Sequence, residues 1–327
     1  MKAYIDLHLH LDGAITVEIA RKLEEKAGII LPEEDTELEQ KLSVSETCEN
    51  LNDFLKCFEL PLSLLQTEET VEEAVYQVQE NIKKDGIVYA EIRFAPQLHC
   101  RNGLSQKQII EASLRGLHKS DLPCNLILCC MRGQDVKAQN METIRLAKKY
   151  LVKDGGVVAI DLAGAEGLFP TADYKEEFEE AQRLGIPVTI HAGEADGAES
   201  VKTALEFGAV RIGHGVRSFE DPGLLQELKR RQTCLEMCPT SNRQTKAIEN
   251  MEQYPFTDYL KMGICVTINT DDMAISRTTI QKEFSYVEKM YGLTEEQKER
   301  LFLNAVQSAF TTDERKKQLI NEYAVRG

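Results

Sequence analysis

The sequence predicts an α/β fold, a TIM-type (β/α)8 barrel with an inserted helical lid after the first strand and extra C-terminal helices. Short apolar runs typical of buried strands alternate with longer runs of helical period along the 327 residues. Polar residues suited to catalysis follow several of these strands, where barrels carry their active sites. A doubly wound open sheet is the alternative, but no glycine-rich phosphate loop follows the first strand.

Short apolar runs define the predicted strands, at residues 3–9, 88–94, 126–131, 157–162, 188–191, 210–213, 234–237 and 264–269. Helical periodicity predicts helices at residues 17–26, 68–84, 106–119, 141–151, 174–184, 200–207, 222–231 and 253–261. Two closing helices, 279–291 and 294–308, precede a charged tail. No linker or change of composition divides the chain, so we expect residues 1–327 to form one domain.

The first predicted strand carries polar side chains on one face. Asp6, His8 and His10 stand two residues apart, and residues at this spacing project to the same side of a strand. A single histidine in a strand is more often a hydrogen-bonded core residue. Two histidines at this spacing and at a strand end indicate a metal site instead.

An additional segment lies between the first predicted helix and the second predicted strand. Leu51, Phe54, Leu55 and Phe58 recur at helical spacing and form one apolar face. Two interpretations remain open for this face. The helix either docks on the barrel or roofs the pocket and covers a flat apolar ligand.

The fifth predicted strand ends at a histidine and is followed by a carboxylate. Residues 186–190 are apolar and mostly β-branched, and Pro187 marks the entry to the strand. His191 then ends the strand, Gly193 permits a turn, and Glu194 follows. This order places a metal ligand and a general acid or base side by side.

The pair Asp271-Asp272 stands at the C-terminal end of the eighth predicted strand, just after residue 269. In a closed barrel this strand lies beside the first, which brings Asp271 to the histidines. Three histidines and one aspartate suit a catalytic zinc, which keeps one position open for water. A strand-terminal turn is the other interpretation of an Asp-Asp pair. A metal would neutralise Asp271 and leave Asp272 for a substrate.

Two glycine-containing segments add weaker signals. His214 stands between Gly213 and Gly215 after the sixth strand, where it could approach a reacting water. Gly164 follows the fourth strand, where its backbone amide could donate to a ligand. That strand end carries no lysine able to bridge a second metal, so we expect one metal ion per chain.

The composition excludes several kinds of partner. The formal net charge of −15 argues against binding to nucleic acid or anionic membranes. No apolar run approaches the ~20 residues that span a bilayer, and the N-terminus lacks the features of a signal peptide. The nine cysteines are odd in number and sit mostly in apolar segments, as expected of reduced thiols in a cytoplasmic protein.

Seven segments, taken together and in order, resemble the adenosine deaminase family of the amidohydrolase superfamily, from about residue 4 to residue 280. They are His8-Leu9-His10-Leu11-Asp12-Gly13-Ala14, Tyr89-Ala90-Glu91-Ile92-Arg93-Phe94, Asp161-Leu162-Ala163-Gly164, His191-Ala192-Gly193-Glu194, Gly213-His214-Gly215, Cys238-Pro239-Thr240-Ser241-Asn242 and Asn269-Thr270-Asp271-Asp272. Two positions depart from the pattern of many members, Ala165 and Met273. Both departures bear on the shape of the pocket and not on a chemical role.

The resemblance implies a role for each site residue. Zinc, one ion per chain, would be held by His8, His10, His191 and Asp271. Glu194 would carry a proton to the purine ring, and His214 would hold the attacking water. Asp272 would meet the purine at N7 and Gly164 at N3. His10 and Asp12 would approach the ribose hydroxyl.

The implied reaction is the hydrolytic deamination of adenosine, and of 2′-deoxyadenosine, in purine metabolism. The expected partner is a small nucleoside, and the expected state is a cytoplasmic monomer or weak oligomer. One alternative is an amidohydrolase for another 6-aminopurine, although Asp12 favours a substrate with a ribose. Another is a zinc-stabilised binding protein without catalysis, against which Glu194 and His214 argue.

Overall fold

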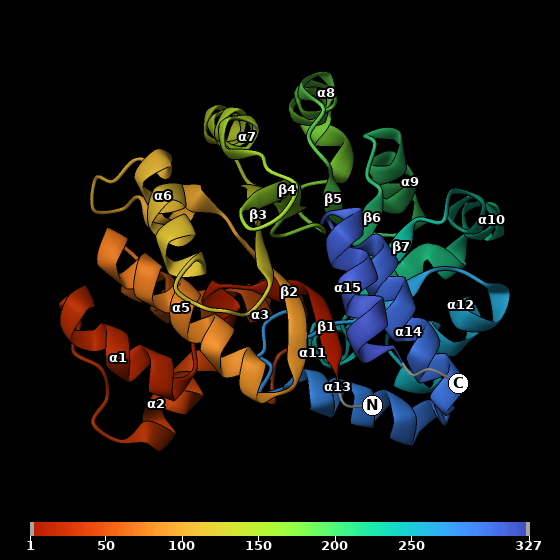
Figure 1. Cartoon of the computed structure of the whole chain (residues 1–327), viewed down its shortest axis with the longest axis horizontal. Helices are drawn as coiled ribbons and strands as arrows, with labels where there is room; N and C mark the ends of the chain where they lie inside the picture. Colours follow the sequence, from red (N-terminus) through yellow and green to blue (C-terminus); the bar gives the residue numbers. More distant parts are fainter. Residues whose placement is uncertain (1–2, 325–327) are drawn as a thin grey trace.

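The computed structural model describes residues 3–324, in which helices surround parallel strands (Figure 1). The strands are β1 (Tyr4–His10), β2 (Ile87–Phe94), β3 (Cys124–Met131), β4 (Val157–Ala163), β5 (Thr189–Ala192), β6 (Arg211–His214), β7 (Cys234–Met237) and β8 (Val266–Ile268). They pair in two parallel groups, β1-β2-β3-β4 and β5-β6-β7-β8. Each predicted strand is present, with ends that differ by at most two residues.

Backbone hydrogen bonds join the two groups of strands at both sides. The amide of Ile160 in β4 donates to the Pro187 carbonyl at 3.0 Å, just before β5. The amide of Asp271, beyond β8, donates to the His8 carbonyl at 2.7 Å, and the His10 amide donates to the Asp271 carbonyl at 2.8 Å. The strands therefore close into a barrel, which confirms the predicted fold and excludes the open sheet.

The longer helices lie outside the strands (Figure 1). The helices are α1 (Val17–Ala27), α2 (Asp35–Leu42), α3 (Leu51–Leu55), α4 (Glu59–Leu64), α5 (Glu68–Lys84), α6 (Gln106–Leu117), α7 (Lys137–Tyr150), α8 (Lys175–Leu184), α9 (Ala198–Glu206), α10 (Pro222–Arg231), α11 (Pro239–Gln244), α12 (Phe256–Met262), α13 (Ile280–Tyr291), α14 (Glu295–Ser308) and α15 (Asp313–Tyr323). Among the residues described, no helix has the length and apolar character needed to cross a bilayer.

The segment between α1 and β2 differs from the continuous apolar helix expected at residues 51–58. Helix α3 begins after Asn50, whose side chain accepts a hydrogen bond from the Asp53 amide. A 3₁₀ turn, η2 (Lys56–Phe58), then separates α3 from α4. The apolar side chains nevertheless stay on one face, because the 3₁₀ turn continues the helical course of the chain.

The charged C-terminal tail contains a helix that the sequence analysis did not predict. Helix α15 has one buried residue, Leu319, among eleven, so its apolar pattern is weak. Leu319 belongs to a buried cluster that includes Phe302 of α14 and Leu7 of β1. Figure 1 shows α15 beside α14, close to β1. The last helices therefore anchor the C-terminal segment against the first strand.

The nine cysteines lie within residues 3–324, and all are free thiols. Five of them, Cys124, Cys129, Cys130, Cys234 and Cys238, are buried. Burial raises the pKa of the Cys124 and Cys130 thiols well above the usual value. These side chains are therefore protonated packing groups and not nucleophiles.

Candidate active site

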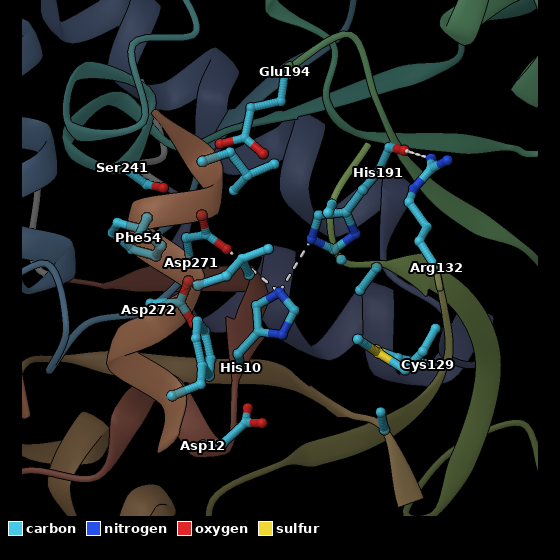
Figure 2. A pocket seen from close by; sticks show the side chains of 18 of the residues that line it. His10, Asp12, Phe54, Cys129, Arg132, His191, Glu194, Ser241, Asp271 and Asp272 are labelled. Carbon is cyan, nitrogen blue, oxygen red and sulfur yellow. Dashed lines mark hydrogen bonds and ion pairs between the residues drawn. The ribbon is translucent and has the colours of Figure 1, made fainter. Parts of the chain in front are cut away.

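A cavity of about 260 Å³ opens at the C-terminal ends of the strands (Figure 2). Its lining combines polar residues of the barrel with apolar residues of the segment before β2. The volume lies just below the ~300–1,000 Å³ range typical of pockets for drug-sized molecules. The cavity therefore suits a small molecule.

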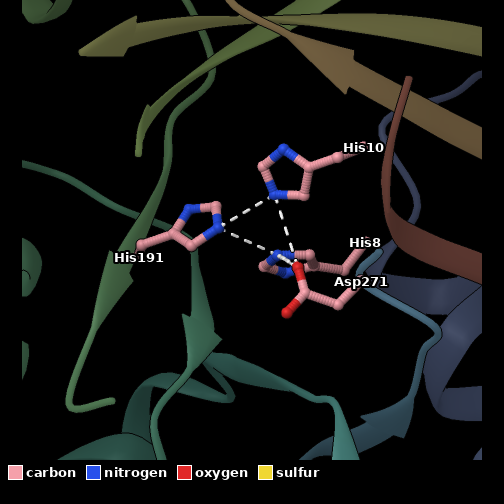
Figure 3. A group of neighbouring side chains, drawn as sticks. All are labelled: His8, His10, His191 and Asp271. Atoms are coloured by element: carbon pink, nitrogen blue, oxygen red, sulfur yellow. Dashed lines mark hydrogen bonds and ion pairs between the residues drawn. The ribbon is translucent and has the colours of Figure 1, made fainter. Parts of the chain in front are cut away.

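The predicted metal ligands converge at this cavity (Figure 3). One donor atom from each of His8, His10, His191 and Asp271 lies within 4.8 Å of the other three. His191 Nε2 is 3.0 Å from His8 Nε2 and 3.1 Å from His10 Nε2. Asp271 Oδ1 is 3.1 Å from His8 Nε2 and 3.4 Å from His10 Nε2. Zinc binds nitrogen and oxygen ligands at ~2.0–2.2 Å. Donor atoms 3.0–3.4 Å apart are therefore close enough to contact one ion together.

The protonation of these side chains also fits a cation. His8 Nδ1 is hydrogen bonded to Glu236 Oε2 at 2.8 Å, so a neutral His8 ring would carry its proton there and turn its Nε2 lone pair to the cluster. Without a metal, burial lowers the pKa of His8 but the carboxylates of Asp271 and Glu236 outweigh it and raise that pKa. Burial is the main cause that lowers the pKa of His191, and it holds the pKa of His10 well below its usual value. Neutral nitrogens and a carboxylate facing one another repel unless a cation lies between them. The residues present therefore fit a zinc ion.

Carboxylates behind the ligands orient two of the imidazoles. Glu236 contacts His8, and Asp161 Oδ2 lies 2.8 Å from His191 Nδ1. Arg93 bridges the two carboxylates, at 2.9 Å from Asp161 and 2.8 Å from Glu236. No local sequence pattern predicts a role for these three residues, because their partners are far away in the chain.

A second group of potential donors lies beside the cluster. His214, Cys238 and Asp271 each place one such atom within 4.8 Å of the others. Burial holds the pKa of the Cys238 thiol well above its usual value, and the thiol donates to the Glu236 carbonyl at 3.4 Å. Because Asp271 belongs to both groups and the thiol keeps its proton, these residues do not form a separate metal site.

His214 ends β6 in the left-handed region, with φ of 61°. Asn242 donates its amide proton to His214 Nδ1 at 2.9 Å, and Asn242 Oδ1 accepts from Tyr254 at 2.8 Å, which fixes the amide orientation. Burial holds the pKa of His214 well below its usual value. The neutral ring therefore carries its proton on Nε2, which lies 3.5 Å from Glu194 Oε2 and 3.9 Å from Asp271 Oδ2.

Glu194 follows β5 and is buried, with 5% of its surface exposed. Thr245 donates to Glu194 Oε1 at 2.8 Å. Burial, with the negative charge of Asp271 as a second cause, raises the pKa of Glu194 to about 8. A carboxylic acid that keeps its proton at neutral pH is suited to act as a general acid.

Asp272 lies on the side of the cavity near His10 and Asp12 (Figure 2). Its Oδ1 atom is buried and has no hydrogen-bond partner. Burial and the neighbouring Asp271 hold the pKa of Asp272 well above its usual value. A protonated carboxyl group with a free oxygen is able to donate to an acceptor on a bound molecule.

Asp12 and Gly164 also line the cavity, as the sequence analysis expected. Burial raises the pKa of Asp12 to about 6, and its Oδ1 atom has no partner. Gly164 has a φ of 106°, where a side chain would be strained. The predicted position Asp6 lies outside this lining and accepts from Thr270 Oγ1 at 2.6 Å, which ties β1 to the end of β8.

The apolar stripe of the inserted segment faces the cavity. Leu51, Phe54, Leu55 and Phe58 all line it, together with Leu62 of α4. Phe54 is 1% exposed and also packs with a small buried cluster that includes Val44 and Ile275. The stripe therefore contributes both to the cavity and to packing, and the second interpretation of this face is the better supported.

Comparison with known proteins agrees with this geometry. A family model described as adenosine deaminase matches residues 4–325. An adenosine deaminase of Haemophilus ducreyi is 48% identical over 323 residues, which cover 97% of this chain and 94% of that protein. An adenine deaminase of Arthrobacter aurescens has a similar structure, with a TM-score of 0.88, 27% identity and 98% of each chain covered.

A more distant structure shares the fold. An amidohydrolase of Burkholderia ambifaria with bound Zn has a TM-score of 0.86 at 19% identity, and the match covers 98% of this chain and 89% of that one. The family match spans the first strand to the last described helix, and it includes every residue that converges on the cavity. The chain therefore belongs to the adenosine deaminase family.

Proposed function

We propose that this protein catalyses the hydrolytic deamination of adenosine to inosine and ammonia. The observation that carries this proposal is the position of Glu194, whose carboxyl group lies 3.5 Å from His214 in the cavity that also contains the metal-ligand cluster. The identity of 48% to an adenosine deaminase over almost the whole chain supports the same reaction. We propose 2′-deoxyadenosine as a second substrate.

One zinc ion per chain would be held by His8, His10, His191 and Asp271. When bound, zinc supplies a Lewis acid that makes water a strong nucleophile near neutral pH. Glu236 and Asp161 keep the His8 and His191 rings turned toward the cluster. The distances among the four ligands and the zinc in a structural relative support this assignment.

Glu194 donates its proton to N1 of the purine as the attack at C6 disrupts the aromatic ring. Without that proton, negative charge would accumulate on N1. His214 orients the attacking water, because its Nε2 proton faces both Glu194 and Asp271. The attacking water supplies two protons: one restores the Glu194 carboxyl group and the other converts the amino group to ammonia. Ammonia then leaves, and the 6-oxo product is inosine.

The remaining polar residues hold the substrate. Asp272, in its protonated form, donates to purine N7, and the Gly164 amide donates to N3. His10 and Asp12 lie near the ribose hydroxyl, and the unpartnered Asp12 oxygen suits that contact. The apolar side chains of Leu51, Phe54 and Phe58 cover the flat ring and exclude water from the reaction.

The proposal extends to the state of the whole protein. We propose that residues 1–327 form one domain that acts as a monomer or weak oligomer in the cytoplasm, without nucleic acid or membrane partners. One buried apolar cluster that includes residues of both strand groups supports the single domain. The nine free thiols support the cytoplasm, and the net charge of −15 argues against nucleic acid and anionic membrane partners.

A direct ammonia assay on a panel of 6-aminopurines tests the reaction. We expect adenosine and 2′-deoxyadenosine to be turned over, and adenine to react poorly because it leaves Asp12 without a partner. If adenine is turned over in preference to adenosine, this protein is instead an adenine deaminase, like the structural relative from Arthrobacter aurescens. Tight nucleoside binding without ammonia release would overturn the catalytic assignment.

A further inference from the structure

The turn that carries Glu194 is bound by another carboxylate, that of Glu166. Glu166 lies in the loop after β4 and is 1% exposed. Its Oε1 atom accepts from the Gly193 amide at 2.7 Å. Its Oε2 atom accepts from the amides of Glu194 at 3.0 Å, Ala195 at 2.7 Å and Asp196 at 3.1 Å. One buried side chain thus satisfies four consecutive backbone donors.

These four donors need such a partner. Gly193 has a φ of 72°, which turns the chain sharply after β5 and points successive amides to one side. Successive backbone N–H groups arranged in this way form a concave site for an anion. Without an acceptor, these donors would lose their hydrogen bonds in a region largely closed to water. The conformation of the turn therefore depends on Glu166.

The same network reaches the backbone on the other side of the turn. Ser200 of α9 donates to Glu166 Oε1 at 2.6 Å and contacts Thr171 Oγ1 at 2.7 Å. Arg132 donates to Thr171 Oγ1 at 2.9 Å and to the His191 carbonyl at 2.6 Å (Figure 2). A continuous buried chain of hydrogen bonds therefore holds the turn from residue 191 to residue 196.

We propose that Glu166 is a positioning residue that sets the location of the Glu194 carboxyl group in the cavity. The inference rests on the proposed function, because Glu194 is the proton donor in that reaction. Three of the five bonds to Glu166 come from the Glu194 amide and from its two neighbours, Gly193 and Ala195. A small displacement of this turn would move Glu194 away from the substrate ring, and misplacement of about 1 Å can lower a rate about 100-fold.

The role requires a carboxylate. Both oxygens of Glu166 accept protons, three on Oε2 and two on Oε1 counting Ser200. A glutamine would turn its NH₂ group toward one of these two sets of donors, so Glu166→Gln should displace the turn while keeping the size of the side chain. Ser200→Ala removes one bond and leaves the four backbone bonds, and it should have a smaller effect of the same kind.

A matched control separates positioning from simple stabilisation. Asn125 is fully buried, and its Oδ1 accepts from the amides of Gly155 at 2.6 Å and Gly156 at 3.3 Å. It stands near the beginning of β3, at the opposite end of the barrel from the cavity. Asn125→Ala should lower the melting temperature and leave kcat unchanged.

The decisive experiment is a double-mutant cycle with adenosine as substrate and purified zinc-loaded protein. We expect Glu166→Gln to lower kcat about 100-fold with bound zinc retained and KM changed much less. In the Glu194→Gln background the same change should lower the residual kcat less than about twofold, because its effect passes through Glu194. Ser200→Ala should lower kcat severalfold and also lose its effect in that background.

Three results would overturn the proposal. One is a Glu166→Gln variant that resembles Asn125→Ala, with a lower melting temperature and normal kcat. Another is that Glu166→Gln lowers kcat by the same factor whether residue 194 is glutamate or glutamine. If Glu166→Gln does not fold, an unchanged kcat of Ser200→Ala would reject the inference. Failure of the wild-type enzyme to release ammonia would instead reject the proposed function.

Discussion

A Cβ atom on Gly13 would lie 1.8 Å from Asp272 Oδ1. The backbone of η1 (Asp12–Ala14) therefore occupies the space directly behind the Asp272 carboxyl group. The Gly13 carbonyl also accepts from the Ala274 amide at 2.9 Å, which fixes the distance between the two segments. Glycine at this position is what allows the Asp272 side chain to stand in the cavity beside Asp12.

We predict that Gly13→Ala displaces Asp272 and weakens the binding of the purine. The added methyl group cannot be accommodated unless the carboxyl group moves. KM for adenosine should rise, by about 10-fold or more if one hydrogen bond of ~1.5 kcal/mol is lost. Bound zinc should remain, because Gly13 does not contact the ligands. Steady-state kinetics and metal analysis measure the two quantities, and an unchanged KM would contradict the role given to Asp272.

Truncation of Phe54 tests the apolar roof of the cavity. Phe54 belongs to a small cluster with Val44 and Ile275, so Phe54→Ala should cost less stability than the ~3–5 kcal/mol typical of a deep core. Lost contact with the purine should raise KM by a factor that corresponds to ~1–3 kcal/mol. The control is Phe178 of α8, which is buried and stacks on Phe207 with 5.7 Å between the ring centres. Phe178→Ala should lower the melting temperature without changing KM.

A site residue could be predicted from the sequence where a local pattern marks it. It could not be predicted where its role depends on a contact with a residue far away in the chain. His8 and His10 could be recognised because strand spacing places them on one face, and His191 and Asp271 because each ends an apolar strand. Glu166 could not be assigned in this way, because its partners begin 27 residues further along the chain. Asn242 lies 28 residues from the His214 ring that it orients, and no local pattern indicates that contact.

The same limit applied to the fold. Eight strands were predictable because short apolar runs that alternate regularly with helical segments are typical of buried parallel strands. Helix α15 was missed because only Leu319 is buried, and one apolar position produces no periodic signal. The break between α3 and α4 was missed because the apolar stripe continues through the 3₁₀ turn at residues 56–58. The pattern of apolar side chains shows which face of a segment is buried. It does not show where a 3₁₀ turn interrupts the helix that carries this face.

Removal of His191 should abolish metal binding. The cluster has four donors and no spare protein ligand among the residues described, so His191→Ala should lose zinc and activity together. Asp161→Asn leaves the four ligands in place, weakens the contact to His191 Nδ1 and removes the negative charge that pairs with Arg93. It should weaken zinc about 10- to 100-fold, as is typical for loss of such an outer contact. Titration with a competing chelator measures both variants, and full zinc content in His191→Ala would reject the ligand set.

The stability of the metal-free protein should depend on pH through Glu194. The pKa of Glu194 is raised from 4.5 to about 8 in the folded chain. The folded state therefore holds a proton that the unfolded chain releases, and this contribution is complete below pH 4.5 and lost as the pH rises to about 8. Relative to wild type, Glu194→Gln should gain stability over this interval. Thermal unfolding at several pH values tests the sign, and a relative loss would show that the pKa is not raised.

Glu194→Gln also separates proton transfer from metal binding, which involve residues only three positions apart in the chain. Glutamine preserves the size of the side chain and can still accept the 2.8 Å hydrogen bond from Thr245, but it has no acidic proton to give to the purine. Zinc and substrate should bind normally, whereas kcat should fall by the ~10²–10⁴-fold typical of general acid catalysis. Thr245→Val is the matched variant, because it removes the contact and leaves the acid, and it should lower kcat much less.

If Glu194→Gln protein loses zinc, or keeps a near-normal kcat, the proton must come from another group. Asp272 is then the first alternative, since it is the other carboxyl group in the cavity whose pKa burial holds well above its usual value.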